Sequence, residues 1–338
     1  MDLHLFWFAL LGVLLTGYAI LDGFDLGVGI VHLAARRDDE RRVLLNAIGP
    51  LWDGNEVWLV TFGGALFAAF PRAYAAAFSA FYLPFMLLLF ALIFRAVSIE
   101  FRSKRESAAW RRFWDGAFFT ASALATFLMG VAVGDSMLGI PIGPDGDYTG
   151  GVTDLLRPYA LLVGVLAVAT FALHGSIYLH LKTEGELQRR IHGWMWRAFA
   201  FFLAVYMLVT VVTLVAVPAA TRNFANLPWA WVVVLLNILA VANIPRAIFR
   251  GKPLGAFVSS SCTIAALVFL FGVALFPNLI VSSSDPAWSL TIANAASSEK
   301  TLRIMRTIAF LGMPFVAAYT AVVYWVFRGK VELGKFSY

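Results

Sequence analysis

The chain has 338 residues, of which 61% are apolar, only 14% are charged and 30 are Phe. Soluble domains carry roughly 25% charged residues, so this composition excludes an ordinary soluble domain. The net charge of +6 does not indicate nucleic-acid binding, because Lys and Arg fall in short connections between apolar stretches, where they orient a chain in a bilayer.

Apolar stretches near the roughly 20 residues that a helix needs to cross a bilayer core recur along the whole chain. They predict an all-α polytopic membrane protein, with residues 1–338 as a single integral membrane unit. The expected spans are 5–31, 51–70, 74–99, 115–138, 159–181, 198–217, 228–249, 256–281 and 307–327. Pro84, Pro245, Pro277 and Pro314 fall inside these spans and are expected to be tolerated there. The first span has no basic residue before it, unlike a cleavable signal peptide, so we expect it to stay in the mature protein.

Basic residues divide unevenly between alternate connections. Most follow the first, third, fifth and seventh spans or lie in the C-terminal tail, whereas the other side holds Arg72, Arg157, Arg222, Lys300, Arg303 and Arg306. By the positive-inside rule, the N-terminus is expected outside and the C-terminus in the cytoplasm. The long acidic segment 139–154 is then expected to face outward.

Ionisable residues gather at one depth of the predicted membrane, on the first three spans. They are Asp22 and Asp25, three positions apart on one helix face, Asp53 and Glu56 at the same spacing, and Arg95 and Glu100. Since the first span runs inward and the second outward, all six fall in the cytoplasmic part of the membrane. Such a cluster, open toward the cytoplasm, is what a proton-uptake route needs, because neighbouring acids can pass protons along. The alternative is an ion-pair cluster that only fixes helix packing.

Other candidate residues favour structural roles. Gly23 and Gly27 predict a close approach of two helices, and Asp135 is interpreted as an interfacial residue. The five histidines do not form a paired set: His174 and His180 are six residues apart and point to different faces, and His4, His32 and His192 lie at span ends or in loops. We therefore expect no haem ligand in this chain. With Cys262 as the single cysteine, no disulfide or Cys-based metal site is expected either.

Two long motifs in the first two spans carry a family resemblance. Residues 17–29 (GYAILDGFDLGVG), then Arg41 and Arg42, then residues 52–59 (WDGNEVWL) closely resemble subunit II of the cytochrome bd-type quinol oxidases. Further matches are residues 63–70 (GGALFAAF), 101–104 (FRSK), 289–291 (SLT) and 296–298 (ASS). The match is dense over the first 115 residues and returns around the last two spans.

The resemblance implies nine transmembrane helices, arranged as two four-helix bundles plus one, in a bacterial or archaeal cytoplasmic membrane. It implies a partner, subunit I, that carries two haems b and haem d, oxidises quinol and reduces oxygen to water in the aerobic respiratory chain. No cofactor is therefore expected in this chain. The resemblance leaves open a small accessory subunit, the preferred quinone, and a structural quinone in this subunit, which is known in some members only.

The resemblance also suggests roles for single residues. Asp22, Asp25 and Asp53 are expected on a proton path toward the haems, and Trp58 near a membrane entrance for oxygen. Glu56 stands where the family often has Gln, so it ranks below the three aspartates, with Arg95 and Glu100.

Two other functions stay open at this point. A proton-coupled secondary transporter is the alternative, since broken helices with midplane acids are its usual signature. Against it, the acids lie toward one side, and no second half of the chain repeats them. A purely structural scaffold that inserts and holds subunit I is a third interpretation.

Overall fold

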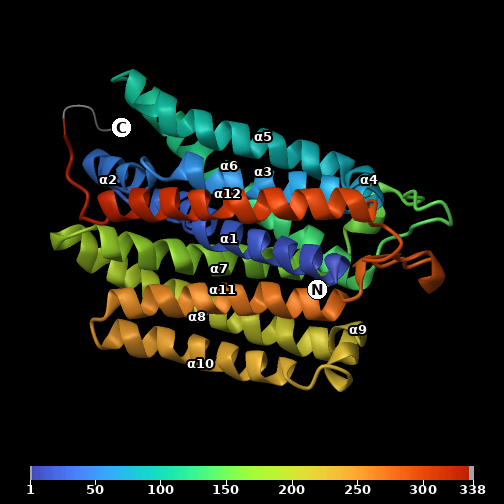
Figure 1. Ribbon diagram of the computed structural model, residues 1–338. Helices are drawn as coiled ribbons and strands as arrows, with labels where there is room; N and C mark the ends of the chain where they lie inside the picture. Colours follow the sequence, from blue (N-terminus) through green and yellow to red (C-terminus); the bar gives the residue numbers. More distant parts are fainter. Residues whose placement is uncertain (1, 335–338) are drawn as a thin grey trace.

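The computed structural model describes residues 2–334, which form a bundle of long helices lying side by side (Figure 1). Eight helices within this range are long and apolar enough to cross a membrane, by length and composition. They are α1 (Leu3–Val31), α5 (Tyr82–Phe101), α6 (Ala108–Leu138), α7 (Pro158–Lys182), α8 (Gly185–Ala216), α10 (Ala230–Phe249), α11 (Pro253–Leu275) and α12 (Glu299–Val326). An all-α polytopic membrane protein is thereby confirmed.

Helix α3 (Trp52–Ala69) lies along α1 in the same bundle. It has 18 residues and carries Asp53, Asn55 and Glu56 in its first two turns, and it is not one of the eight that meet the length and composition of a membrane span. The shorter helices are α2 (Asp38–Ile48), α4 (Pro71–Ala80) and α9 (Ala219–Arg222). Helix α2 was not expected from the sequence, because it is strongly polar on one face and too short for a span.

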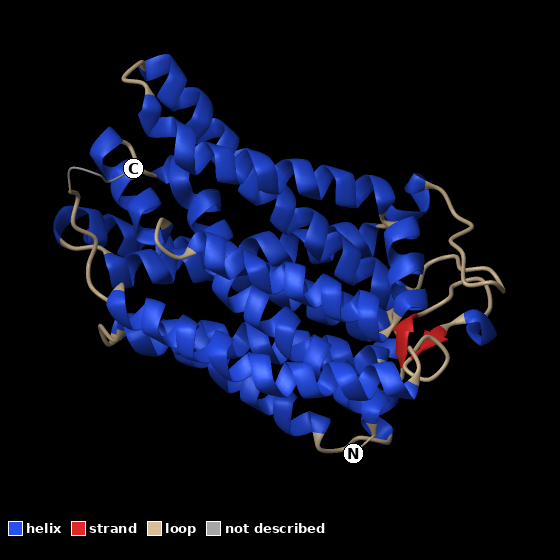
Figure 2. Cartoon of the chain, turned by 45° about the horizontal axis from the view of Figure 1, so that its top comes forward, coloured by secondary structure: helices blue, strands red, loops and turns tan. Residues whose placement is uncertain are grey.

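The two ends of the bundle differ in structure. One end, called here the α2 end, carries α2 and the short 3₁₀ turns η1 (His32–Ala34) and η2 (Arg102–Lys104). The other, called the sheet end, carries strands β1 (Asn278–Ile280) and β2 (Leu290–Thr291), which pair antiparallel with Asn278 opposite Thr291 (Figure 2). The 3₁₀ turns η3 (Val152–Leu155), η4 (Asn223–Ala225) and η5 (Pro286–Trp288) complete the described elements.

Prolines interrupt two of the expected spans. The stretch 74–99 is divided at Phe81 into α4 and α5, since Pro84 has no N–H and its ring opposes the carbonyl of Ala80. The expected span 256–281 ends at Leu275, two residues before Pro277, and continues as strand β1. Pro245 and Pro314, in contrast, lie inside α10 and α12.

Three other helices begin earlier than expected. Helix α8 starts at Gly185 instead of 198, because Leu187, Ile191 and Met195 recur every four residues and give its charged first part a buried face. Helices α6 and α12 start at Ala108 and Glu299, where the hydroxyls of Ser107 and Ser298 cap the first turn. Hydropathy windows exclude these polar first turns.

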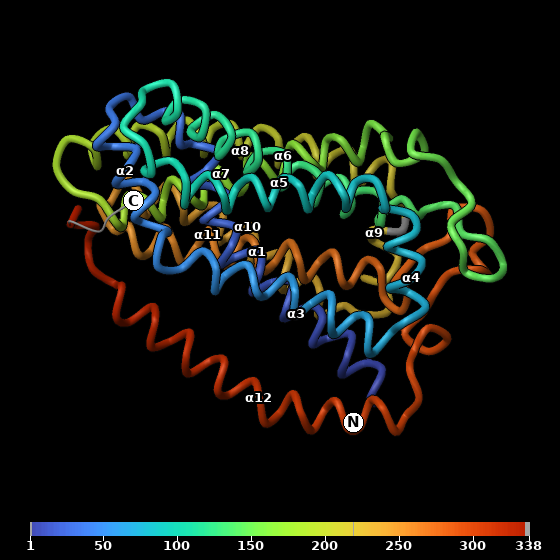
Figure 3. The backbone as a smooth tube through the Cα atoms, turned by 90° about the horizontal axis from the view of Figure 1, so that it is seen from above, coloured from blue at the N-terminus to red at the C-terminus, as the bar shows by residue number. Residues whose placement is uncertain are grey.

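Helix α1 lies at the centre and packs against α3, α6, α7 and α11. The two glycines Gly27 and Gly175 let α1 and α7 approach closely: a Cβ on Gly27 would lie 1.9 Å from the carbonyl oxygen of Phe171. Helix α12 runs along the edge of the bundle (Figure 3), and Leu302 is its buried residue.

Candidate functional site

A bidentate ion pair between α1 and α5 forms the centre of the candidate site. Arg95 donates from Nη1 to Oδ2 of Asp22 at 2.8 Å and from Nη2 to Oδ1 at 2.5 Å. Both side chains are 0% exposed. Because an isolated charge in an apolar interior costs several kcal/mol, the guanidinium and the carboxylate stabilise each other here.

The second aspartate of α1 has a different partner. Asn55 of α3 donates from Nδ2 to Oδ2 of Asp25 at 2.7 Å and to the carbonyl oxygen of Leu21 at 3.3 Å. The hydroxyl of Tyr324, on α12, donates to Oδ1 of Asn55 at 2.8 Å. Asp25 is also 0% exposed. The sequence analysis did not single out Asn55 or Tyr324, which lie 269 residues apart in the chain.

The remaining acids extend this cluster toward the surface of the chain. Oε2 of Glu56 lies 3.9 Å from Nη2 of Arg95, and its side chain is 23% exposed. Asp53 is exposed one turn earlier on α3, and Glu100 is partly buried near the end of α5. The structure therefore brings Asp22, Asp25, Glu56 and Arg95 together and places Asp53 at the rim.

Trp58, the oxygen-entry candidate, is partly buried on α3. Its indole ring covers Gly17 of α1, where a Cβ would lie 2.5 Å from Cε3. Trp58 thus helps to set the contact between α1 and α3 beside the acids.

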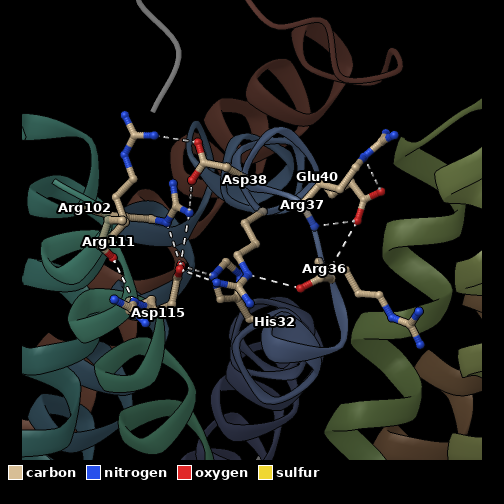
Figure 4. Close-up of polar contacts among 12 residues, drawn as sticks. His32, Arg36, Arg37, Asp38, Glu40, Arg102, Arg111 and Asp115 are labelled. Atoms are coloured by element: carbon tan, nitrogen blue, oxygen red, sulfur yellow. Dashed lines mark hydrogen bonds and ion pairs between the residues drawn. The ribbon is translucent and has the colours of Figure 1, made fainter. Parts of the chain in front are cut away.

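A second buried cluster surrounds Asp115 at the α2 end (Figure 4). The carboxylate of Asp115 contacts Nε2 of His32 at 2.6 Å, Nε of Arg102 at 2.6 Å and Nη1 of Arg41 at 2.7 Å. Arg102 also donates to Asp38 at 2.7 Å, and Arg111 does so at 2.9 Å. This cluster joins η1, α2, α6 and η2. The sequence analysis missed it, although Arg41 and Arg102 lie in the matched motifs.

Helix α2 is also tied to α8 through a buried acid. Glu40, whose side chain is 2% exposed, forms ion pairs with Arg190 of α8 and with Arg37, the latter at 3.0 Å. Its Oε2 accepts hydrogen bonds from the backbone N–H groups of Arg36 and Arg37. The polar face of α2 is therefore fixed by salt bridges.

Two polar residues at the ends of predicted spans are buried within the chain. Asp135, interpreted as an interfacial residue, lies in the last turn of α6, where it is 0% exposed and pairs with Arg157 at 2.7 Å. His32, placed at a span end, is 0% exposed in the Asp115 cluster. In both cases the buried polar group has a partner of opposite charge or a strong hydrogen bond, as burial requires.

His174 of α7 also has partners at both ring nitrogens. Nδ1 of His174 lies 2.7 Å from Oγ of Ser260, Nε2 lies 3.1 Å from the carbonyl oxygen of Ile20, and the ring stacks on Phe257 at 4.8 Å. Between residues 2 and 334, no group of three or more His, Cys, Asp or Glu side chains is placed to hold a metal ion.

Comparison with known proteins identifies the family. Residues 3–327 match the family described as cytochrome bd terminal oxidase subunit II. Cytochrome bd-I ubiquinol oxidase subunit 2 of Escherichia coli K12 is 37% identical, covering 97% of this chain and 95% of that protein. Cytochrome bd ubiquinol oxidase subunit 2 of Bacillus subtilis 168 is 36% identical, covering 98% and 97%.

A solved structure shows the same fold. The bd oxidase from Geobacillus thermodenitrificans contains a chain that superposes with a TM-score of 0.81 at 16% identity, covering 97% of this chain and 99% of that one. At this identity the likeness concerns the fold alone. Together with the family match and the two relatives, it shows that the chain belongs to the cytochrome bd terminal oxidase subunit II family.

Proposed function

We propose that this chain is the non-haem subunit II of a cytochrome bd-type terminal quinol oxidase. The match of residues 3–327 to the subunit II family carries this proposal, and the relatives are named as ubiquinol oxidase subunits. The chain is then a multi-pass protein of the bacterial cytoplasmic membrane, in an oxidoreductase that passes electrons from quinol to oxygen. A proton-coupled transporter is not favoured, because full-length relatives are oxidase subunits.

The proposal places two haems b and haem d in the partner, subunit I. In the described part of the chain, the two buried histidines already have partners: both ring nitrogens of His174 are engaged, and His32 contacts Asp115. Co-purification with a haem-bearing partner, whose visible spectrum shows haems b and d, tests this assignment. Isolation of this chain alone with bound haem contradicts it.

The acids around Arg95 form the proposed proton-uptake route, with Asp22, Asp25 and Asp53 as its principal members and Glu56, Arg95 and Glu100 as weaker ones. One guanidinium neutralises one buried carboxylate, Asp22, so a second buried charge on Asp25 lacks a counter-ion within hydrogen-bonding distance. Uncompensated charge at this depth is costly, which favours a proton on Asp25. Asp53 and Glu56 lead from this carboxyl toward the exposed surface of α3.

Asp53→Asn tests the proton route, with Asp39→Asn as a matched control on an exposed acid of α2. We expect normal assembly and haem content but slower quinol oxidation and proton uptake for Asp53→Asn, and no effect of Asp39→Asn. Unchanged proton uptake in assembled Asp53→Asn excludes Asp53 from the route. If instead every acid variant affects assembly alone, the scaffold function is the correct one.

The proposed topology has nine spans, with α3 as the ninth, in two four-helix bundles plus one helix. Its support is the excess of Lys and Arg at the α2 end, which places that end in the cytoplasm and the N-terminus outside. Labelling of single cysteines introduced at Ser107 and Ser284, one at each end of the bundle, in a chain in which Cys262 is replaced by Ser, tests this orientation with a membrane-impermeant reagent. Labelling of Ser107→Cys from outside contradicts it.

The face of α3 is the proposed contact with subunit I. Asp53 is exposed on it. Gly64, eleven positions further on, lies on the same side of the helix and is also exposed, and a Cβ added there would meet nothing within 4 Å. Lipid is a poor neighbour for a charged group, whereas small residues let another helix approach closely. Trp58, the proposed oxygen entrance, lies on the side of α3 that contacts Gly17 of α1. Crosslinking from Gly64→Cys to subunit I tests the contact.

An apolar cavity of about 460 Å³ offers a site for a structural quinone. It lies between α1, α6, α7, α8, α10 and α11, and the polar residues that line it include Tyr18, Tyr206 and Asn237. Asn237 is 2% exposed and its Oδ1 has no hydrogen-bond partner among the described residues. Solvent extraction of the purified complex tests for quinone, and Asn237→Leu is expected to lower the amount recovered.

A further inference from the structure

The C-terminal helix is connected to the buried acids by one chain of hydrogen bonds, although it lies at the edge of the bundle. Near the end of α12, the hydroxyl of Tyr324 donates to Oδ1 of Asn55 at 2.8 Å. The amide of Asn55 in turn donates to Oδ2 of Asp25 at 2.7 Å. Three helices, α12, α3 and α1, are thus joined in sequence.

The direction of this chain depends on which end of the amide faces Asp25. An asparagine amide has a donor NH₂ and an acceptor oxygen, and here the NH₂ faces both Asp25 and the carbonyl oxygen of Leu21. The opposite end is buried, and a buried oxygen without a donor costs about 1–3 kcal/mol. Tyr324 supplies that donor, so its hydroxyl favours the orientation in which Asn55 donates to Asp25.

The position of Tyr324 is itself held by the segment that follows α12. Lys182, at the end of α7 and only 8% exposed, donates to the carbonyl oxygens of Phe327 and Gly329, the latter at 3.0 Å. Val331 donates back to the carbonyl oxygen of Lys182 at 2.9 Å. A cation near the last carbonyls of a helix is favourable, so this contact anchors the end of α12 against the bundle.

We propose that Tyr324 is a positioning residue for Asp25. Its hydroxyl holds the Asn55 amide so that the NH₂ group occupies Oδ2, which leaves Oδ1 as the oxygen that takes up and releases the proton. Oδ1 of Asp25 is buried and has no hydrogen-bond partner in the described part of the chain. This inference rests on the proposed function, because it assumes that Asp25 carries a proton.

Tyr324→Phe in the purified complex tests the inference, because it keeps the ring and removes the hydroxyl. The infrared carboxyl band of Asp25, identified by its loss in Asp25→Asn, is expected to shift, together with the pH profile of oxygen consumption. Loss of one hydrogen bond predicts about a two- to tenfold decrease in turnover, with haem content unchanged. Tyr319→Phe, an identical change at a 67% exposed position of the same helix, is expected to match the wild type.

The outcomes separate this inference from the proposed function. An Asp25 band and a pH profile that both stay unchanged in Tyr324→Phe overturn the positioning role. Wild-type turnover in Asp25→Asn overturns the proton route itself, whatever Tyr324→Phe does. If Tyr324→Phe does not assemble, Lys182→Met provides the second test, since release of the α12 end is expected to shift the same band, and an unshifted band contradicts the inference.

Discussion

Arg95→Gln removes the guanidinium that pairs with Asp22 and thereby tests whether this buried ion pair supports the fold. The pair is bidentate, at 2.8 and 2.5 Å, and both partners are wholly buried. Removing one partner of a buried pair costs about 3–5 kcal/mol, because the other charge is left uncompensated. At about 2 °C per kcal/mol, the lower end of the range for chains of 150–250 residues, we expect the melting temperature to fall by roughly 6–10 °C.

Thermal unfolding of the detergent-solubilised complex measures this effect, with Arg303→Gln as the control. Arg303 pairs with Glu299 at 2.6 Å, but the two side chains are 65% and 69% exposed, so the pair contributes only about 0–1 kcal/mol. The double variant Asp22→Asn/Arg95→Gln removes both charges and is expected to recover part of the loss. The reasoning fails if Arg95→Gln unfolds within about 2 °C of Arg303→Gln.

Two further variants test packing and the second cluster. Gly27→Ala would place a Cβ 1.9 Å from the carbonyl oxygen of Phe171, so α1 and α7 must separate. We expect a lower melting temperature or failed assembly. Gly12→Ala, where the added Cβ has nothing within 4 Å, is the control and is expected to be neutral. Asp115→Asn leaves Arg102 and Arg41 without their shared carboxylate. We expect it to lower the free energy of unfolding by about 3–5 kcal/mol, measured by thermal unfolding. A stability equal to that of Asp39→Asn, a variant at an exposed position, contradicts this expectation.

The part of the site that was predictable from sequence depends on helix direction and spacing. Asp22 and Asp25 share a face because they are three residues apart, and the opposite directions of successive helices bring Arg95 and Glu56 to their level. Asn55 and Tyr324 could not be found in this way, because their contact joins positions 269 residues apart, and no periodicity relates them. Their aromatic and amide side chains also carry no charge that marks them as unusual in a membrane.

The missed elements have a common physical cause. Helix α2 and the first turns of α6 and α8 are polar, so a search for apolar stretches excludes them. Their amphipathic spacing is visible only in part, as in Leu187, Ile191 and Met195. The broken span at Phe81 was signalled by Pro84, but a proline near a helix start can be tolerated or can end the preceding helix, and the local sequence alone does not decide between these outcomes.

The two buried acid clusters differ in charge balance, and the proposed proton route rests on this difference. Asp115 contacts two arginines and His32 through its two oxygens, so its carboxylate is fully compensated and has little room to accept a proton. Around Asp22, Asp25 and Glu56 a single arginine, Arg95, faces three carboxyl groups. Since burial of charge without compensation is costly, at least one proton is favoured in the cluster around Arg95 and none in the cluster around Asp115. A structural ion-pair network would need the balance found at Asp115, and the excess of acids at Arg95 is therefore the feature that favours proton transfer over packing.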